Sequence, residues 1–481
     1  MSIAVMKRYD GERDEREALP QLRELATQAF SRAAGAPLVP GNDVRLLRDA
    51  RENYPAWLSA IRGARRHVHF EMYFIQDDAC GREFADALIG KAREGVSVRL
   101  VYDWLGNFRR ASRRFWNALR EAGVEVRCYN PPRPESPLGW LSRDHRKMLA
   151  VDGEIGFITG LCVGDAWAGD PARGIEPWRD TGIEIRGPAL AELERAFART
   201  WATLSEPIPE IAATSPPAGD VSLRIVASEP ATIGMLRLNQ LVAALARSRL
   251  WIADAYYAGT PSYVQALRAA ARDGVDVRLL LPHSSDIPIL RPLSRAGYRP
   301  LLEAGVRIFE WNGTMMHAKT GVADSHWARV GSTNLNIASW FGNCELDAVI
   351  EDDAFAHRME EMYLEDLGNA TEVVLDRRHK VSAPGEPRHR RTATGSGSAR
   401  AAGAGALRIG NAIGAVFTDR RVLGPAEARL AVNAGLLLCA FSVLFAVFPE
   451  ALAFPLIALG AWGGVALLYR GYELHRRRKK D

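Results

Sequence analysis

The chain has 481 residues, of which 47% are hydrophobic and 25% are charged, a composition typical of a globular protein with a sizeable core. A net charge of +5 and a pI of about 9.0 indicate an anionic partner, without choosing between lipid and nucleic acid. Five scattered cysteines exclude a disulfide framework, and no CxxC or Cys/His cluster suggests zinc. Residues 1–16 carry charges where a signal peptide needs its apolar stretch, so we expect no export signal.

The first expected element is an N-terminal helical segment, residues 1–40. Leu19, Leu22, Leu25 and Phe30 recur there near the helical period.

Two comparable halves follow. In the first half, strand, helix and strand are predicted at 67–75, 84–93 and 96–104. In the second half, the same order is predicted at 249–257, 263–272 and 275–282. The stretches 118–130 and 300–312 also match. Two unrelated α/β domains could share this succession of strand, helix and strand, but the common order over the whole of both halves favours a duplicated unit with lobes at 41–215 and 216–377.

The amino-acid composition of the chain changes near residue 378. Residues 378–424 read as a basic flexible linker followed by a weakly amphipathic segment. Residues 425–481 contain two uncharged apolar runs, Leu430 to Phe448 and Ala451 to Tyr469, with basic residues on both outer sides. The positive-inside rule predicts a transmembrane hairpin with both ends in the cytoplasm. A buried or re-entrant helical hairpin is the alternative.

One short pattern occurs once in each half of the chain. A histidine is followed by a lysine two places on and by an aspartate five further, and a turn of small residues comes later at the same distance. The residues of the two copies are His145, Lys147, Asp152 and the turn 159–162, and His317, Lys319, Asp324 and the turn 331–334. A single match is a weak signal, but two matches at equivalent places of a repeated unit indicate chemistry.

These residue types suit a two-step exchange at a phosphodiester. One histidine attacks phosphorus and forms a phosphohistidine, and the second gives a proton to the leaving oxygen and later takes one from the incoming alcohol. The lysines neutralise the non-bridging oxygens. Alternation along a strand would put each histidine and its lysine on one face.

With these motifs, the chain resembles the phospholipase D superfamily and, within it, the cardiolipin synthase-like subfamily. The resemblance covers roughly residues 40–375. It includes further stretches: Glu71 to Tyr73, Gly81 to Phe84, Tyr102 to Trp104, Gly164 to Trp167, Trp178 to Asp180, Leu302 to Val306, and Asn343 with Glu345.

The resemblance implies an α/β fold of two duplicated phospholipase D-like α-β-α lobes with the active site at their interface, here with a C-terminal apolar helical hairpin. It implies catalysis without metal or cofactor, with His145 as the nucleophile and His317 as the general acid/base. It also implies that Asp180 and Glu345 orient the two imidazoles, without saying which carboxylate serves which. Two roles are open for the motif residues Asp152 and Asp324: contact with the substrate, or support of neighbouring backbone or lysine, which we favour.

The turns depart from the family pattern. Ser332 and Asn334 are expected to bind phosphate, but Thr159 stands where glycine is usual and Cys162 where asparagine would donate. A thiol is a weak donor, so the first half is expected to hold phosphate less tightly. The residues at 336 and 338 are Asn and Ala, where the family often has Asp and Arg.

The leading hypothesis is a cardiolipin synthase-type phosphatidyltransferase that releases glycerol. The alternatives are a phospholipase D, which would use water as the acceptor, a metal-independent nuclease, and a non-enzymatic membrane scaffold. The expected partners are phosphatidylglycerol, with phosphatidylethanolamine as a second donor, and an anionic membrane surface, but no nucleic acid. The expected location is the bacterial inner membrane, with the catalytic domain on the cytoplasmic side. The sequence does not predict an oligomeric state.

Overall fold

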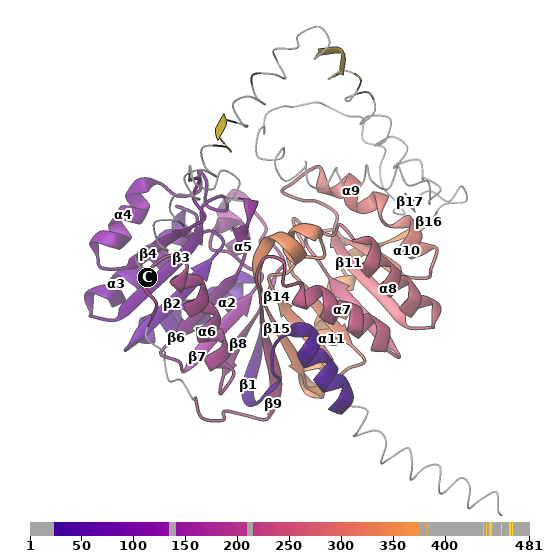
Figure 1. Cartoon of the computed structure of the whole chain (residues 1–481), viewed down its shortest axis with the longest axis horizontal. Helices are drawn as coiled ribbons and strands as arrows, with labels where there is room; N and C mark the ends of the chain where they lie inside the picture. Colours follow the sequence, from indigo (N-terminus) through magenta and orange to yellow (C-terminus); the bar gives the residue numbers. More distant parts are fainter. Residues whose placement is uncertain are drawn as a thin grey trace, which may run out of the picture.

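A computed structural model describes residues 24–133, 141–208, 215–375 and 381–382, together with isolated positions between 436 and 464. Two twisted sheets lie side by side, and helices cover their outer faces (Figure 1). Residues 24–34 form a helix ahead of the first strand. It contains Leu25 and Phe30 of the predicted N-terminal helix, whereas Leu19 and Leu22 lie outside the described residues.

The sheet of the first lobe has the strand order β4-β3-β2-β6-β7-β8-β1. β2, β3 and β4 are parallel, and the remaining pairs are antiparallel. Its strands are β1 (Val39–Arg48), β2 (His67–Met72), β3 (Ser97–Asp103), β4 (Glu125–Tyr129), β6 (Lys147–Val151), β7 (Ile155–Thr159) and β8 (Thr181–Arg186). Every residue of β6 is buried, as expected for a central strand covered on both faces.

The sheet of the second lobe repeats this order as β12-β11-β10-β13-β14-β15-β9, again with three parallel strands at one end. Its strands are β9 (Val221–Ser228), β10 (Arg249–Ala253), β11 (Asp276–Pro282), β12 (Arg307–Trp311), β13 (Thr320–Ala323), β14 (Trp327–Gly331) and β15 (Asn343–Glu351). β16 (Ala370–Leu375) adds to β12, and β17 (Val381–Ser382) adds to β16. The two sheets therefore share one topology.

The two sheets are joined at their antiparallel ends. β1 pairs with β8 of its own lobe and also with β9 of the other, through Val39 with Leu223 and Asn42 with Val221. The short strand β5 (Arg143–Asp144) pairs in parallel with the start of β15. The two lobes therefore meet through the β1–β9 and β5–β15 pairings. Both histidine motifs lie next to this junction.

Local sequence signals account for where the helices begin. Side-chain oxygens cap α3 (Asp78 to Gly81 N–H), α4 (Ser112 to Phe115 N–H) and α11 (Asp352 to Phe355 N–H). In α8 a proline occupies the first turn, where its missing N–H has no cost. The helices are α2 (Asp49–Gly63), α3 (Ala79–Arg93), α4 (Arg113–Glu121), α5 (Asp165–Ala168), α6 (Leu190–Ala202), α7 (Gly234–Leu245), α8 (Pro261–Arg272), α9 (Leu290–Ala296), α10 (Arg299–Leu302) and α11 (Asp353–Leu367); a 3-10 turn (Pro171–Arg173) and a π-helical turn (Ala338–Gly342) complete them.

Among the described residues, the hydrophobic core has three parts. One cluster lies within the first lobe around Trp57, Phe84 and Phe157, and another lies within the second around Tyr263, Leu267 and Tyr298. The third crosses the junction and contains residues of both lobes, including Ile183, Phe197, Leu346 and Phe355. This shared core holds the two lobes in one fixed arrangement, because separating them would expose apolar side chains.

Some predicted bounds differ from the structure. The first strand ends at Met72 rather than at residue 75, because Ile75 leaves the sheet to bridge Val163, and the following helix begins at Ala79 rather than at residue 84. The histidines and Lys319 also lie outside the strands predicted for them: β6 begins at Lys147 and β13 at Thr320.

The remaining predictions concern the C-terminal part of the chain. Within the described residues, no helix has the length and apolarity needed to cross a membrane. The predicted linker at 378–424, apart from Val381–Ser382, and the predicted hairpin at 425–481, apart from isolated positions, lie outside the described residues.

Candidate active site

Both histidines reach the junction because the residue before each one pairs with the opposite lobe. Asp144 pairs with Cys344 in the β5–β15 ladder, and the His145 N–H then donates to the Cys344 carbonyl at 2.9 Å. On the other side Met316 bridges Arg179, and the His317 N–H donates to the Arg179 carbonyl at 2.7 Å. The backbone of each motif is therefore anchored on the partner lobe.

Each imidazole also contacts a carboxylate of the opposite lobe. His145 Nδ1 lies 2.9 Å from Glu345 Oε2, and His317 Nδ1 lies 2.6 Å from Asp180 Oδ2. This answers the question that the sequence left open about which carboxylate faces which histidine. A carboxylate only accepts, so Nδ1 carries the proton in both rings and Nε2 keeps its lone pair.

Burial keeps both imidazoles neutral in the free protein. His145 is 8% exposed and His317 is 4% exposed. Burial lowers the pKa of His145 to about 4 and that of His317 to about 3, although the facing carboxylates act in the opposite direction. For Asp180, burial favours the neutral form, but the interaction with His317, the charge of Lys319 and the hydrogen bond from Trp167 together outweigh it and lower the pKa to about 2. Asp180 is therefore ionised at neutral pH.

The two lysines lie beside the histidines. Each lysine Nζ donates to the carbonyl of its own histidine, Lys147 to His145 at 2.6 Å and Lys319 to His317. Lys319 Nζ also lies 2.8 Å from Nδ1 and 3.1 Å from Nε2 of His317, so this ammonium lies over the face of the ring. Burial lowers the pKa of Lys319 to about 8, with Asp180 acting against this shift.

The two carboxylates are held by different means. Glu345 accepts from Ser332 Oγ at 2.5 Å and from Asn343 Nδ2 at 3.2 Å. Ser332 Oγ also accepts the Leu346 N–H, so this hydroxyl supports Glu345 rather than being available for the phosphate contact expected of it. The structure therefore places Ser332 behind the histidine–carboxylate pair.

Gly160 occupies the place in the first lobe that Ser332 has in the second. A Cβ at Gly160 would lie 2.2 Å from Asp180 Oδ1, so only glycine leaves room for this carboxylate. Asp180 receives its hydrogen bonds instead from Trp167 Nε1 and from the Thr181 N–H, both at 2.9 Å. A tryptophan in one lobe thus does what a serine does in the other.

The two turns differ in what they can offer a phosphate. Asn334 is 3% exposed, and its Oδ1 has no hydrogen-bond partner within the described part of the chain. The amide carries this acceptor oxygen and an NH₂ donor, so the buried group keeps a polar atom for a ligand. Cys162, at the equivalent place, is 1% exposed, and burial raises the pKa of its thiol. Of these two positions, only Asn334 therefore offers an amide to a phosphate.

The motif aspartates lie at the far end of β6 and β13 from the imidazoles. Asp152 accepts the N–H groups of residues 65, 66 and 67 at 2.7–2.8 Å, and Asp324 accepts those of residues 247, 248 and 249 at 2.8–3.0 Å. Burial acts to raise both pKa values, but these backbone bonds outweigh it and lower them. Of the two roles open from sequence, the geometry matches backbone support.

The sequence analysis placed three of the aromatic residues around the imidazoles in family-like stretches but gave none of them a role in the site. Tyr73 lies edge-on to His145 at 4.9 Å, and Tyr256 lies edge-on to His317 at 5.6 Å. Trp167 and Trp178 also contact the His317 ring, at 5.2 and 5.6 Å. The available signal was their position: each tyrosine follows closely on a buried parallel strand, at the edge where such sheets carry their sites.

Arg146 was also missed, although it lies between the histidine and lysine of the first motif. Its fully buried guanidinium donates to Thr200 Oγ1 and to the carbonyls of Ala196, Ser228 and Glu345. The last two carbonyls belong to the second lobe. Arg146 therefore fixes the first motif against the strand that carries Glu345.

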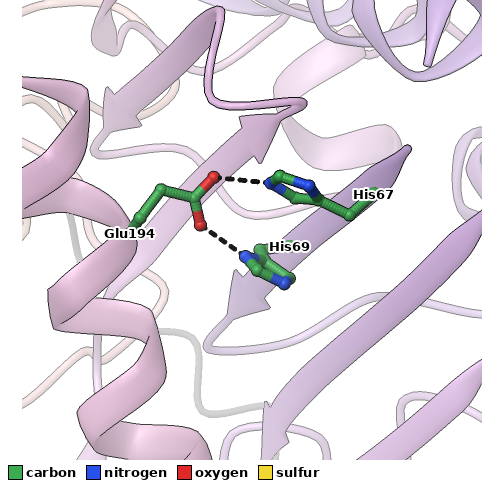
Figure 2. A group of neighbouring side chains, drawn as sticks. All are labelled: His67, His69 and Glu194. Carbon is green, nitrogen blue, oxygen red and sulfur yellow. Dashed lines mark hydrogen bonds and ion pairs between the residues drawn. The ribbon is translucent and has the colours of Figure 1, made fainter. Parts of the chain in front are cut away.

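Within the described residues, one group has the donor set for a metal ion: His67, His69 and Glu194 (Figure 2). His67 Nε2 lies 2.9 Å from one Glu194 oxygen, and His69 Nδ1 contacts the other. A metal on Nδ1 would require a proton on Nε2 of His69, yet that nitrogen faces Arg99 NH1 at 3.4 Å. The surroundings therefore fit a hydrogen-bonded triad. This triad lies at the start of β2, remote from His145 and His317.

Comparisons with known proteins agree on one family. The sequence matches the family described as "Cardiolipin synthase, PLD-like domain" over residues 57–201 and 241–367. A cardiolipin synthase of Alkalihalophilus pseudofirmus is 32% identical over 348 residues, 70% of this chain and 68% of that protein. Cardiolipin synthase A of Pseudomonas fluorescens is 34% identical over 357 residues, 72% of this chain and 73% of that protein.

Among solved structures, the phosphatidylserine synthase of Haemophilus influenzae superposes with a TM-score of 0.57 at 13% identity, covering 72% of this chain and 91% of that one. A likeness at this identity establishes the mixed α/β fold and nothing further. The fold prediction agrees with it at that level.

Proposed function

The chain belongs to the cardiolipin synthase family of phospholipase D-like proteins, and from this membership and the site geometry we propose that it is a phosphatidyltransferase that makes cardiolipin. The observation that carries the proposal is the pair of imidazoles, each held by a carboxylate of the opposite lobe at 2.9 and 2.6 Å. In this proposal the active site lies at the interface of two duplicated lobes.

In the first half-reaction, His145 Nε2 forms a bond to the phosphorus of phosphatidylglycerol, and the bond from phosphorus to the glycerol oxygen breaks. His317 gives its Nε2 proton to that oxygen, and glycerol leaves. The phosphodiester anion favours the protonated form of His317, which is neutral in the free enzyme. The Nδ1–H of His145 stays hydrogen-bonded to Glu345, and this carboxylate stabilises the positive charge of the phosphorylated ring.

The charges around the two rings support one choice of the attacking lone pair. The Lys319 ammonium lies 2.8 Å from Nδ1 and 3.1 Å from Nε2 of His317, and a positive charge this close lowers the basicity of the ring, which makes it the poorer nucleophile. Within the described residues, the Lys147 ammonium contacts the His145 carbonyl and makes no hydrogen bond to the His145 ring. This difference supports His145 as the nucleophile and His317 as the general acid/base.

In the second half-reaction, a hydroxyl of a second phosphatidylglycerol gives its proton to His317 Nε2 and attacks phosphorus. The bond from phosphorus to His145 breaks, and cardiolipin leaves. Lys147 and Lys319 neutralise the non-bridging oxygens in both steps, and Asn334 supplies a further polar contact.

The lipid substrates place the enzyme at a membrane. The apolar runs of residues 425–481, with their basic flanks, support a hairpin that anchors the protein in the bacterial inner membrane with the catalytic lobes on the cytoplasmic side. The basic residues of 378–424 would then lie against an anionic leaflet, where each contributes about 1 kcal/mol. Membrane flotation of full-length protein and of a chain ending at residue 377 tests this anchoring. Flotation of the shortened chain at the full-length level would contradict it.

Lipid analysis tests the proposed reaction. Detergent-purified protein is incubated with phosphatidylglycerol labelled in its headgroup, beside His145→Ala and a folding control by circular dichroism. We expect cardiolipin and free glycerol in equal amounts, and neither in the variant. Phosphatidic acid without cardiolipin would make the enzyme a phospholipase D, and unchanged turnover in His145→Ala would refute the covalent route.

A further inference from the structure

The two halves of the candidate site match closely until the tyrosine hydroxyls are reached. Tyr73 and Tyr256 each stand edge-on to the histidine of their own lobe, and each ring also faces the neighbouring lysine, with Lys147 Nζ at 5.0 Å and Lys319 Nζ at 5.8 Å. Both tyrosines are partly buried, so each ring connects a buried imidazole with the rim of the site. Up to this point the chemistry on the two sides is equivalent.

Beyond the hydroxyls the two sides carry opposite charge. Tyr73 Oη accepts from Arg143 NH1 at 3.4 Å. Tyr256 Oη instead donates to Oδ1 of Asp286 at 2.8 Å. Asp286 lies in the loop between β11 and α9 and is exposed. In the described part of the chain it makes no ion pair within 4.0 Å, and its further contact is a weak one from Ser285 Oγ at 3.4 Å.

The side of His317 is the side of the alcohol. In the proposed function, on which this inference rests, glycerol leaves from beside His317, and the hydroxyl of the second phosphatidylglycerol arrives there. The leaving glycerol carries two free hydroxyls, and one of them lies at the far end of its three-carbon chain from the reacting oxygen. A group that recognises this terminal hydroxyl must accept a hydrogen bond and must lie one headgroup length from His317.

We propose that Asp286 is the headgroup-binding residue, whose carboxylate accepts a hydrogen bond from the terminal hydroxyl of the leaving glycerol. Its position fits because one tyrosine ring separates it from His317, and a three-carbon polyol has a similar length. Its chemistry fits because a carboxylate has two acceptor oxygens and Tyr256 occupies only one bond of Oδ1. The indole of Trp178, partly buried and 5.6 Å from the His317 ring, offers an apolar face to the carbon chain.

The side of His145 lacks this chemistry. Arg143 cannot accept a hydrogen bond, and in the proposed mechanism that side holds the nucleophile rather than the alcohol. An exposed carboxylate would also repel the phosphodiester if it lay among the lysines. The charge difference between the two rims therefore follows the direction of the reaction.

The alternative is that Asp286 only fixes the orientation of the Tyr256 ring through its hydrogen bond to the hydroxyl. A double-mutant cycle separates the two roles, with glycerol release from headgroup-labelled phosphatidylglycerol measured as a function of its mole fraction in detergent micelles. The proteins are full-length wild type, Asp286→Ala, Asp286→Asn, Tyr256→Phe and Tyr256→Phe/Asp286→Ala. Circular dichroism and thermal unfolding give the folded fraction of each.

We expect Asp286→Ala to lower kcat/KM by about tenfold or more, mainly through KM, since a hydrogen bond to a charged group is lost. Asp286→Asn keeps a carbonyl acceptor and is expected to lose less than about threefold. The alanine is expected to cost about tenfold again in the Tyr256→Phe background. Wild-type kinetics in Asp286→Ala, or no further loss in the double variant, would overturn the proposal.

An equal loss in the asparagine and alanine variants would also overturn it, because recognition would then follow charge, as for an ammonium headgroup. Failure of the proposed function gives a different result. The wild-type protein itself would then form no cardiolipin, and any glycerol released would appear together with phosphatidic acid.

Discussion

Gly160→Ala tests the arrangement of the His317–Asp180 pair most sharply. The new Cβ would lie 2.2 Å from Asp180 Oδ1, whereas non-bonded contacts require roughly 3.5 Å, so the carboxylate must retreat by about 1 Å. The hydrogen bonds from Trp167 and Thr181 resist this movement. A 1 Å retreat takes Asp180 Oδ2, now 2.6 Å from His317 Nδ1, out of hydrogen-bond reach.

The expected consequence is a loss of catalysis in a folded protein. Misplacement of a catalytic group by about 1 Å costs about a hundredfold in rate, and overpacking of the core costs about 1–3 kcal/mol of stability. The assay is kcat for glycerol release from labelled phosphatidylglycerol, corrected for the folded fraction by thermal unfolding.

A second glycine provides the matched control. Gly90 lies inside α3, and a Cβ there would meet nothing within 4 Å, so Gly90→Ala is expected to gain about 0.5–1 kcal/mol in stability with unchanged kcat. Wild-type kcat in Gly160→Ala would refute the reasoning, because Asp180 would then not be needed where the structure places it.

Three further predictions follow from the site. Asp152→Ala leaves three backbone N–H groups without their acceptor and is expected to lower the free energy of unfolding by about 1–3 kcal/mol, with kcat per folded molecule nearly unchanged; a loss of kcat without loss of stability would contradict this. Lys147→Ala and Lys319→Ala are each expected to abolish cardiolipin formation with wild-type circular dichroism, and retained turnover in either would remove the two-lysine model. Because the pKa of Lys319 is about 8, its positive charge is lost as the pH rises through 8, so initial rates should fall above that pH; constant rates up to pH 9.5 would show that this charge is not required.

The repeated order of elements could be predicted because it depends on local signals. Gly95 and Gly274 follow the helices α3 and α8, and alternating or continuous apolar runs mark β2, β3, β10 and β11. The ends of these elements could not be predicted, because tertiary contacts decide them. The Ile75 N–H, for example, donates to the side chain of Asn107, which draws the chain out of β2.

The residues of the site were found more easily than their partners. His145, Lys147, His317 and Lys319 carry a spacing that a sequence displays directly. The pairing of His145 with Glu345 spans 200 residues, so nothing local indicates it. It follows from the way in which the two lobes meet.

Supporting residues were the hardest to predict, because their roles depend on what lies opposite them in space. The hydroxyl of Ser332 faces Glu345, and the Trp167 indole performs the matching task for Asp180 from a different part of the chain. Residue 160 must then be glycine, because a Cβ there would collide with the Asp180 carboxylate. These three roles become visible only when the two lobes are compared in space.

The covalent intermediate is the central claim, and trapping it is the most direct test. Full-length protein is mixed briefly with phosphatidylglycerol labelled in the phosphatidyl group and quenched in base, since phosphohistidine is labile in acid, and the labelled peptide is identified by mass spectrometry. We expect label on the peptide that carries His145, and no label in His145→Ala. Label on the His317 peptide, or cardiolipin formed by His145→Ala, would contradict it.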